Sequence, residues 1–152
     1  MEWSTHLLSG AVAGYYVTGG NFKGALVGGV AGIISDLDEP ESKFGKVLLP
    51  ISIPLNQLFG HRTLTHSLVF ILGCGLLSYL LTDLWVVYSV MAGIMAHVLG
   101  DMLTGKVMFL YPLKKQIGIP IPRMFFIVMD RITRYSLLVV VVLIFMTHLK
   151  SI

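Results

Sequence analysis

The chain has 152 residues, of which 55% are hydrophobic and only 12% are charged, and its mean hydropathy is +0.82. An ordinary soluble domain is less apolar and carries about twice the charge, so this composition excludes that class and predicts a single integral membrane domain over residues 1–152. The formal net charge of +3 comes from cations spread along the chain, and no specific nucleic-acid partner is predicted.

Two short helices are expected at the start of the chain. The apolar stretch at residues 7–35 contains a single charged residue, Lys23, and the sequence VTGGNFKG at residues 17–24 is a turn signal. The helices should therefore cover about residues 4–18 and 21–35. Glycine recurs every fourth residue from Gly20 to Gly32, which allows another helix to approach closely. The expected partner is a later helical face formed by Ala92, Ala96 and Gly100.

The rest of the chain predicts three further helices. Residues 36–62 contain charges and prolines and are expected to form a polar loop. Helices are then expected over about 65–81, 84–104 and, from Met124 or Asp130, to Leu149. Residues 105–123 include three prolines and should form an irregular surface segment or a short hairpin. The predicted fold is an all-α membrane protein, a compact bundle of about five helices.

The distribution of cations predicts the orientation of this bundle. Lys23 and Lys150 fall on one side of the five-helix arrangement, and nine cations fall on the other. These nine are Lys43, Lys46, Arg62, Lys106, Lys114, Lys115, Arg123, Arg131 and Arg134. Because cytoplasmic loops carry the excess of Lys and Arg, we expect a multi-pass protein of the inner (cytoplasmic) membrane with a cytoplasmic N-terminus.

Seven possible metal ligands are expected at the cytoplasmic ends of the helices. They are His6, Asp36, Asp38, His61, His66, His97 and Asp101. His6 begins the first helix, the two aspartates Asp36 and Asp38 end the second, and His97 with Asp101 lies in the last turns of the fourth. His61 should lie in the loop before the third helix and fold back over its start. The expected site therefore lies at one membrane face.

His97 and Asp101 carry the strongest signal, because their spacing places both side chains on one helix face about one turn apart. The surrounding sequence AGIMAHVLGDML is apolar, where an unpaired histidine or carboxylate is costly. Metal ligation resolves that cost, and a structural His–Asp pair is the alternative.

The other five residues are weak signals when taken singly. Acids at a membrane edge are usually solvated, and single histidines there are usually interfacial polar residues. If all seven lie at the same depth in the membrane, however, four histidines and three carboxylates would have unsatisfied hydrogen-bond donors and strong electrostatic interactions with one another. Divalent ions would remove both problems. Two ions with a carboxylate such as Asp101 between them is the most economical arrangement. Zinc, manganese and iron suit this ligand set, whereas copper(I) does not.

Three arginines could neutralise an anionic substrate. Arg62 lies between His61 and His66, and Arg131 and Arg134 lie at the entry of the fifth helix. Basic residues at a cytoplasmic boundary also serve membrane topology, which is the alternative for all three.

Several motifs resemble a known family. They are an N-terminal Thr-His, a D-x-D after a glycine-rich helix, GHRTLTHS, and HVLGDMLT followed by YPL. These elements, spread over about residues 4–113, are similar to the YdjM-type family of inner-membrane proteins, which are regarded as metal-dependent hydrolases. The resemblance implies a membrane hydrolase.

A more distant resemblance concerns the order His, Asp, His, His-x-x-x-Asp. It is similar to the zinc-dependent phospholipase C and single-strand nuclease superfamily, whose helical enzymes hydrolyse phosphate esters. That resemblance implies the ligands His6, Asp36, His66, His97 and Asp101, with Asp101 bridging two ions. No second His-x-x-x-Glu follows in this chain, so a third zinc is not implied.

These observations together predict a membrane-embedded phosphoesterase that acts on a lipid or lipid-linked phosphate ester through a metal-activated water. Arg62 would hold the anionic group, and His61 or Asp38 would act as the general acid or base. Membrane lipids are the expected partners. Two alternatives remain: a divalent-metal transporter, whose ligands should gather near the bilayer midplane, and a non-catalytic scaffold or regulator with a structural metal.

Overall fold

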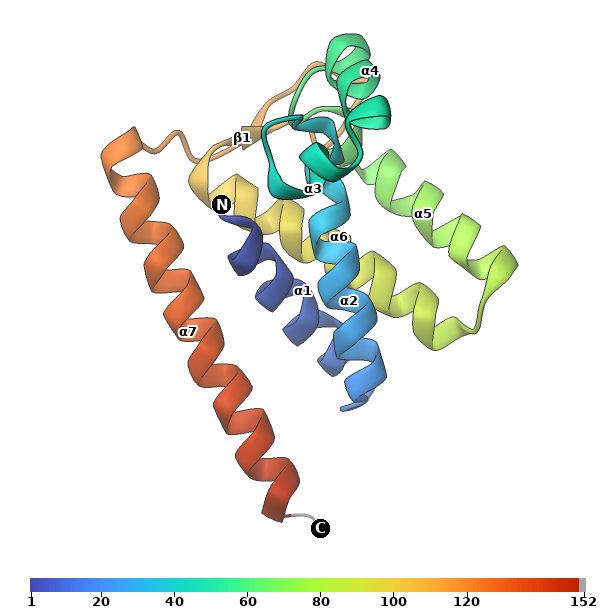
Figure 1. Ribbon diagram of the computed structural model, residues 1–152, viewed down its shortest axis with the longest axis vertical. Helices are drawn as coiled ribbons and strands as arrows, with labels where there is room; N and C mark the ends of the chain where they lie inside the picture. The colour runs from blue at the N-terminus through green and yellow to red at the C-terminus, as the bar shows by residue number, and fades with distance from the viewer. Residues whose placement is uncertain (151–152) are drawn as a thin grey trace.

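The computed structural model describes residues 1–150, which form an all-α fold of seven α-helices and one short hairpin (Figure 1). The helices are α1 (Trp3–Val17), α2 (Phe22–Ile34), α3 (Lys43–Val47), α4 (Leu49–Phe59), α5 (Leu68–Leu81), α6 (Leu84–Thr104) and α7 (Arg123–Lys150). The hairpin pairs β1 (Lys106–Val107) with β2 (Ile117–Gly118), and 3₁₀ turns cover Ser35–Asp38 and Leu64–His66. The five expected helices and the hairpin are therefore present.

The prediction of a polar loop at residues 36–62 is wrong, because this segment contains α3 and α4. Pro50 lies in the first turn of α4, where its missing N–H has no helical partner to lose, so it does not prevent helix formation. Pro54 lies within α4, which nevertheless continues to Phe59. The segment folds over the end of the bundle that contains the N-terminus (Figure 1).

The core of the fold is the trio of α1, α2 and α6, which pack through glycine. A Cβ atom at Gly28 would overlap the carbonyl oxygen of Gly10, and one at Gly93 would overlap the carbonyl oxygen of Gly28. The expected contact between α2 and α6 is thus present, although Gly93, which packs against Gly28, is not among the predicted Ala92, Ala96 and Gly100. Gly100 instead lies against Met1 and His6. Backbone-to-backbone packing of this kind fixes the positions of the three helices closely.

The start of α5 differs by a few residues from the expectation. Ser67 caps the helix, its hydroxyl accepting a hydrogen bond from the Phe70 N–H at 3.2 Å. Thr63 and Thr65, which precede this cap, make other contacts. Thr63 donates to the Phe59 and Gly60 carbonyls, and Thr65 contacts the candidate site.

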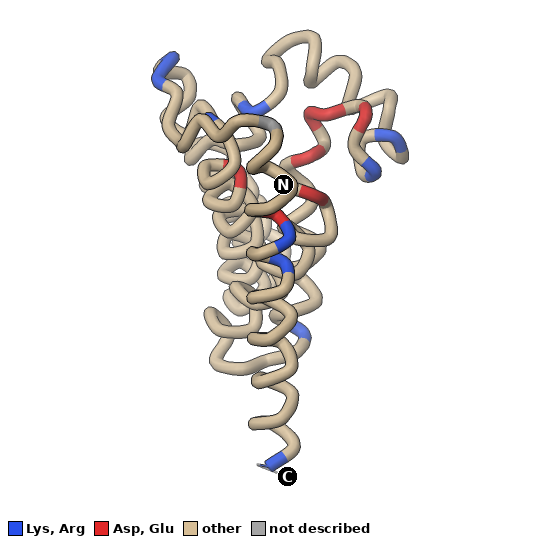
Figure 2. Tube along the Cα trace, turned by 90° about the vertical axis from the view of Figure 1, so that its left-hand side faces the viewer, with Lys and Arg blue, Asp and Glu red and all other residues tan. Residues whose placement is uncertain are grey.

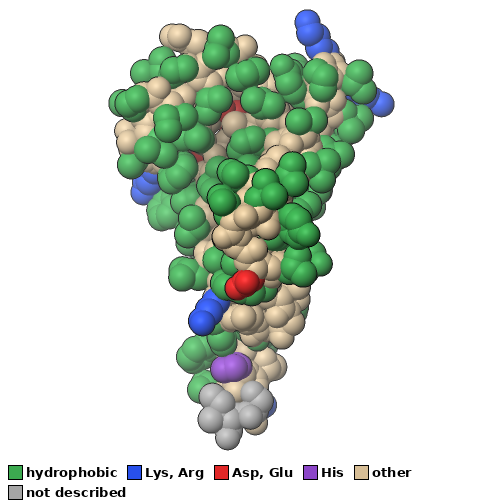
Figure 3. All heavy atoms as spheres, turned by 90° about the vertical axis from the view of Figure 1, so that its right-hand side faces the viewer, with side chains coloured by type: hydrophobic (Ala, Val, Ile, Leu, Met, Phe, Trp, Pro, Cys, Tyr) green, Lys and Arg blue, Asp and Glu red, His purple; other side chains and the backbone are tan. Residues whose placement is uncertain are grey.

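Two described helices are long and apolar enough to cross a membrane, α6 over Leu84–Thr104 and residues Met124–Lys150 of α7. The apolar helix α5 is shorter, at 14 residues. Hydrophobic side chains cover most of the face shown in Figure 3. The charged residues gather mainly at the end that bears the N-terminus, and the C-terminus lies at the other end (Figure 2).

Candidate metal centre

All five residues expected as ligands converge on one buried cluster. His6 comes from α1, Asp36 and His66 come from the two 3₁₀ turns, and His97 and Asp101 come from α6. Their nitrogen and oxygen atoms form two groups that could each hold an ion: His6, Asp36 and His97 in one, and His66, His97 and Asp101 in the other. Within each group all three atoms lie within 4.8 Å of one another.

Asp101 presents one carboxylate oxygen to each side of the cluster. Its Oδ1 lies 3.3 Å from His6 Nε2, and its Oδ2 lies 3.3 Å from His66 Nε2. The α-amino group of Met1 also lies 2.7 Å from Oδ1. A carboxylate with its two oxygens directed at separate imidazoles has the arrangement required of a bridging ligand.

The hydrogen bonds of His66 and His97 turn the Nε2 atoms of both rings into the cluster. His97 Nδ1 lies 2.7 Å from the carbonyl oxygen of Gly32, and because that oxygen can only accept, the proton is on Nδ1. His66 Nδ1 lies 2.9 Å from Thr65 Oγ1, whose hydroxyl in turn donates to Asp38 Oδ2. Such outer hydrogen bonds are typical of histidines that ligate metals.

The Nε2 atoms of His97 and His66 lie only 3.0 Å apart. A contact this short between the two rings requires a positive charge. Two bare nitrogen lone pairs at that distance repel each other unless a proton or a cation lies between them. Burial alone would lower the pKa of His66, but the carboxylates of Asp101 and Asp38 outweigh it and raise the pKa to about 9. Without an ion the ring therefore takes up a second proton, and an ion would supply the same positive charge.

His6 supplies an independent test of whether these residues fit a metal. Its ring is buried, and neither nitrogen has a hydrogen-bond partner among the described residues. The ring stacks on that of His97, with centroids 3.6 Å apart. Ligand bonds of about 2.0–2.1 Å place neighbouring atoms of a tetrahedral site roughly 3.3–3.5 Å apart. The 3.3 Å separations of Asp101 Oδ1 from His6 Nε2 and of Asp101 Oδ2 from His66 Nε2 lie in that range, so Asp101 and these two histidines fit a divalent ion on each side of the carboxylate.

The two aspartates of the D-x-D motif have different surroundings. Asp36 Oδ1 lies 3.7 Å from His97 Nε2, and burial raises the pKa of this carboxyl. Asp38 belongs to neither ligand group. Its Oδ1 lies 2.8 Å from His61 Nδ1, and its Oδ2 accepts from the Arg62 N–H at 3.1 Å and from Thr65.

Asp38 is therefore a charged hydrogen-bond acceptor that orients its neighbours. Burial would raise the pKa of its carboxyl, but hydrogen bonds from His61, His66 and Thr65 outweigh that effect and hold the pKa below its ordinary range. Asn56 of α4 donates to the Asp38 carbonyl at 2.7 Å, so the unexpected helix helps to hold this residue in place.

A cavity of about 610 Å³ opens beside the cluster. Its lining includes Asp36 and Asp101 of the cluster and, beside them, His61, Arg62 and Lys43. Arg62 Nε lies 2.9 Å from Asp101 Oδ2, and the side chain passes close to Gly105, where a Cβ would overlap the guanidinium. The arginine expected to hold an anion is thus next to a possible bridging ligand.

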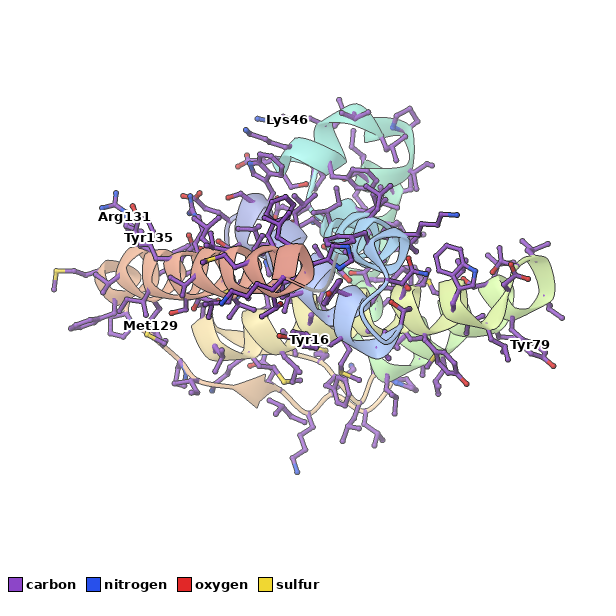
Figure 4. All side chains as sticks on the ribbon, turned by 90° about the horizontal axis from the view of Figure 1, so that it is seen from below. Tyr16, Lys46, Tyr79, Met129, Arg131 and Tyr135 are labelled. Carbon is purple, nitrogen blue, oxygen red and sulfur yellow. The ribbon has the colours of Figure 1, made fainter. Side chains whose placement is uncertain are left out.

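The other two arginines lie elsewhere. Arg134 makes an ion pair with Glu2 at 2.6 Å and another with the buried Asp130, and Arg131 points away from the bundle (Figure 4). Neither lines the cavity. The expectation that they contact an anionic substrate is not supported, because Arg134 is held by carboxylates and Arg131 faces outward.

Two parts of the site were not anticipated from the sequence. Thr65 contacts both Asp38 and His66, and the Gly32 carbonyl orients His97. The threonine lies in the GHRTLTHS motif, so its closeness to two candidate residues was the available signal. A backbone carbonyl of a glycine-rich helix gives no such signal.

Comparison with known proteins adds an independent finding. A family model described as "YdjM inner membrane protein" matches residues 1–151. The chain is 33% identical over 96 residues to Inner membrane protein YdjM of Escherichia coli (strain K12), an alignment that covers 59% of this chain and 49% of that protein. The match to Inner membrane protein YdjM of Shigella flexneri has the same values.

A further relative is Uncharacterized protein YvsG of Bacillus subtilis (strain 168), which is 29% identical over 127 residues, 80% of this chain and 79% of that protein. The chain spans about half the length of the Escherichia coli and Shigella proteins that it matches. No solved structure matches it.

Proposed function

We propose a function for this chain, which belongs to the family of YdjM inner membrane proteins. The chain is a metal-dependent phosphoesterase that acts on a lipid or lipid-linked phosphate ester. The observation that carries this proposal is the pair of ligand groups that share His97, with Asp101 directed at both, beside a cavity lined by Arg62. Two divalent ions, with zinc the best match to the ligands, would lower the pKa of a bound water and polarise the phosphoryl oxygens.

The residues of this chain would then perform three tasks. Arg62 would hold the anionic phosphate, and its guanidinium is itself positioned by Asp101 at 2.9 Å. His61, whose side chain is 32% exposed, would give a proton to the leaving oxygen from the ring nitrogen that does not face Asp38. Asp38 would be a positioning residue, since it fixes the His61 tautomer through the 2.8 Å contact with Nδ1.

The location of the cluster favours an enzyme over a transporter. Its ligands come from the first turn of α1, the turn after α2, the turn before α5 and the last two turns of α6. They therefore lie at helix ends, next to a cavity, whereas transporter sites lie near the bilayer midplane. A scaffold with a structural metal has no need of a cavity lined by a partly exposed imidazole and an arginine.

The multi-pass arrangement and its orientation are part of the proposal. The cluster and the N-terminus would face the cytoplasm, because the cations outside α2 and the end of α7 gather at that end (Figure 2). In a Cys74→Ser background, a membrane-impermeant thiol reagent should reach Thr82→Cys from outside the cell and Lys115→Cys only after permeabilisation. Labelling of both from the same side would contradict the orientation.

Hydrolysis is tested with purified protein loaded with Zn²⁺ or Mn²⁺, using phosphatidic acid and phosphatidylglycerol in mixed micelles. The wild type should release phosphate or a phosphorylated headgroup. His61→Ala should retain its metal but lose about 100-fold or more in kcat, as expected for a general acid. His148→Ala, at the far end of α7, is the matched control and should behave as the wild type. Bound metal with no turnover on either ester would overturn the proposal.

A further inference from the structure

An apolar groove adjoins the polar cavity of the candidate centre. It has a volume of about 180 Å³ and is lined by Trp3, Ile33, Lys43, Phe44 and Val47. Trp3 and Lys43 also line the cavity itself, so the two hollows share a boundary. The Lys43 ammonium lies over the Trp3 ring, 4.5 Å from its centroid. The boundary thus combines a cation with an aromatic ring, a pairing suited to the junction between a headgroup and a chain.

A second groove of about 270 Å³ follows the same seam between α1 and α2. On α1, the first groove is lined by Trp3 and the second groove begins one turn later, at Leu7. On α2, the first groove is lined by Ile33 and the second begins about one turn earlier in the sequence, at Val30. It ends at Phe22. The two grooves therefore lie end to end along the seam, and together they are called the α1–α2 track. The 12 residues from Phe22 to Ile33 correspond to about 16 Å of helix.

Small residues create this track. Ala11, Ala25 and Gly29 line the second groove, while Leu26 and Val30 form a rim and are 72% and 50% exposed. A Cβ at Gly29 would lie 3.3 Å from the Ala11 Cβ, so α1 and α2 are in close contact at this point of the seam. Adjacent to it, a hollow of about 130 Å³ is bounded by α7 through Val141, Ile144 and Phe145.

We propose that this α1–α2 track binds one hydrocarbon chain of a lipid whose phosphate group lies in the polar cavity. The inference rests on the proposed function, because it assumes that the cavity accepts a phosphate ester. Its own support is the boundary that the first groove shares with that cavity at Trp3 and Lys43, and the change from Arg62 and Lys43 at one end to purely apolar lining at the other.

The track should orient a substrate more than it raises affinity. A lipid chain in a bilayer is already out of water, so moving it into an apolar groove gains packing contacts but little hydrophobic free energy. A fixed chain would place the attached phosphate beside His61 and Asp101. Filling the track should therefore reduce turnover of long-chain esters and leave short-chain esters unaffected.

Ala25→Phe tests this directly, because it adds bulk to the floor of the second groove without touching a candidate ligand. Gly73→Phe on α5 is the matched control, since a Cβ there meets nothing within 4 Å and the residue lines none of these grooves. The probes are ethyl and hexadecyl p-nitrophenyl phosphate, which differ only in the alkyl chain. The ratio of kcat/KM for hexadecyl over ethyl should fall about tenfold in Ala25→Phe and remain unchanged in Gly73→Phe. An unchanged ratio in Ala25→Phe would overturn the track while the hydrolase proposal stands.

A second measurement does not depend on turnover. Phosphatidic acid with a diazirine in its acyl chain is photolysed in phosphatidylcholine vesicles that contain the protein, and adducts are located by mass spectrometry. Adducts should concentrate on α2 peptides containing Leu26 and Val30, exceed those on exposed Leu76 and Leu77 of α5, and decrease in Ala25→Phe. Equal labelling of α2 and α5, or a dimer whose interface covers the seam, would contradict the inference. If α2 is labelled selectively but neither ester is hydrolysed, the proposed function is rejected and the track is retained.

Discussion

The α1–α2–α6 trio and α7 are attached to the molecule in different ways. In the trio, glycines bring backbone against backbone, and a Cβ at Gly28 or Gly93 would have no room. On α7 most side chains are exposed, and its described polar contacts with α1 come from Asp130 and Arg134 near one end. Close backbone packing in the trio holds the candidate ligands His6, His97 and Asp101 at fixed separations. The looser helix contributes a side chain of the cavity wall, Phe126.

Gly28→Val should break the trio and produce the largest effect. The new side chain would meet the backbone of both Gly10 and Gly14, and neither can move without shifting α1 and its His6. We expect a loss of roughly 3 kcal/mol or more of stability, seen as a failure to recover monodisperse protein. Gly73→Val, where there is open space, should be recovered normally. A Gly28→Val protein that melts at the wild-type temperature would contradict the role assigned to the glycines.

Thr65→Val acts in the 3₁₀ turn that brings His66 to the trio, and it removes a hydroxyl while keeping the shape of the side chain. Asp38 and His66 would each lose a hydrogen-bond partner, so the His66 ring would no longer be fixed with Nε2 in the cluster. Metal affinity should fall about 10- to 100-fold, measured by competition with a chelating dye. Thr147→Val in α7 removes a hydroxyl that donates to the Ile144 carbonyl and should leave the affinity unchanged. Equal affinities for all three proteins would show that Thr65 does not position His66.

Arg134→Gln tests the α7 side and should have the smallest effect. Arg134 is 27% exposed. After its loss, the buried Asp130 still accepts a hydrogen bond from the Glu2 N–H at 2.8 Å. The expected cost is about 1 kcal/mol, observed as a decrease of a few degrees in Tm, with unchanged metal content. Arg131→Gln, on the outward face of the same helix, should have no effect. Loss of metal in Arg134→Gln would mean that α7 also holds the ligands.

The helices, and the convergence of ligands at one end, could be predicted from the sequence because they depend on local patterns. Apolar stretches and the VTGGNFKG turn locate α1 and α2, and the His97–Asp101 spacing identifies the shared face of α6. The positions of His6, Asp36 and His66 then follow from the order of the helices.

What could not be predicted depends on contacts that leave no periodic trace. The α3–α4 segment has prolines that suggested a loop, and only its tertiary contact through Asn56 explains how it supports Asp38. Gly93, which packs against Gly28 of α2, was not among the residues of α6 expected at that contact, because small residues on a helix indicate a close approach but not the register. Arg134 was a candidate for substrate binding until its pairing with Glu2 and Asp130 was known.

The central claim is that this cluster holds two divalent ions joined by Asp101, and metal content per chain tests it most directly. Elemental analysis of zinc-loaded, dialysed protein should give about two ions per wild-type chain. We expect about one in His6→Ala and one in His66→Ala, because each removes a ligand from only one group. Asp101→Ala should retain almost none, because the two oxygens of Asp101 face His6 on one side of the cluster and His66 on the other. A wild-type chain that binds no ion, or an Asp101→Ala chain that retains both, would contradict the account.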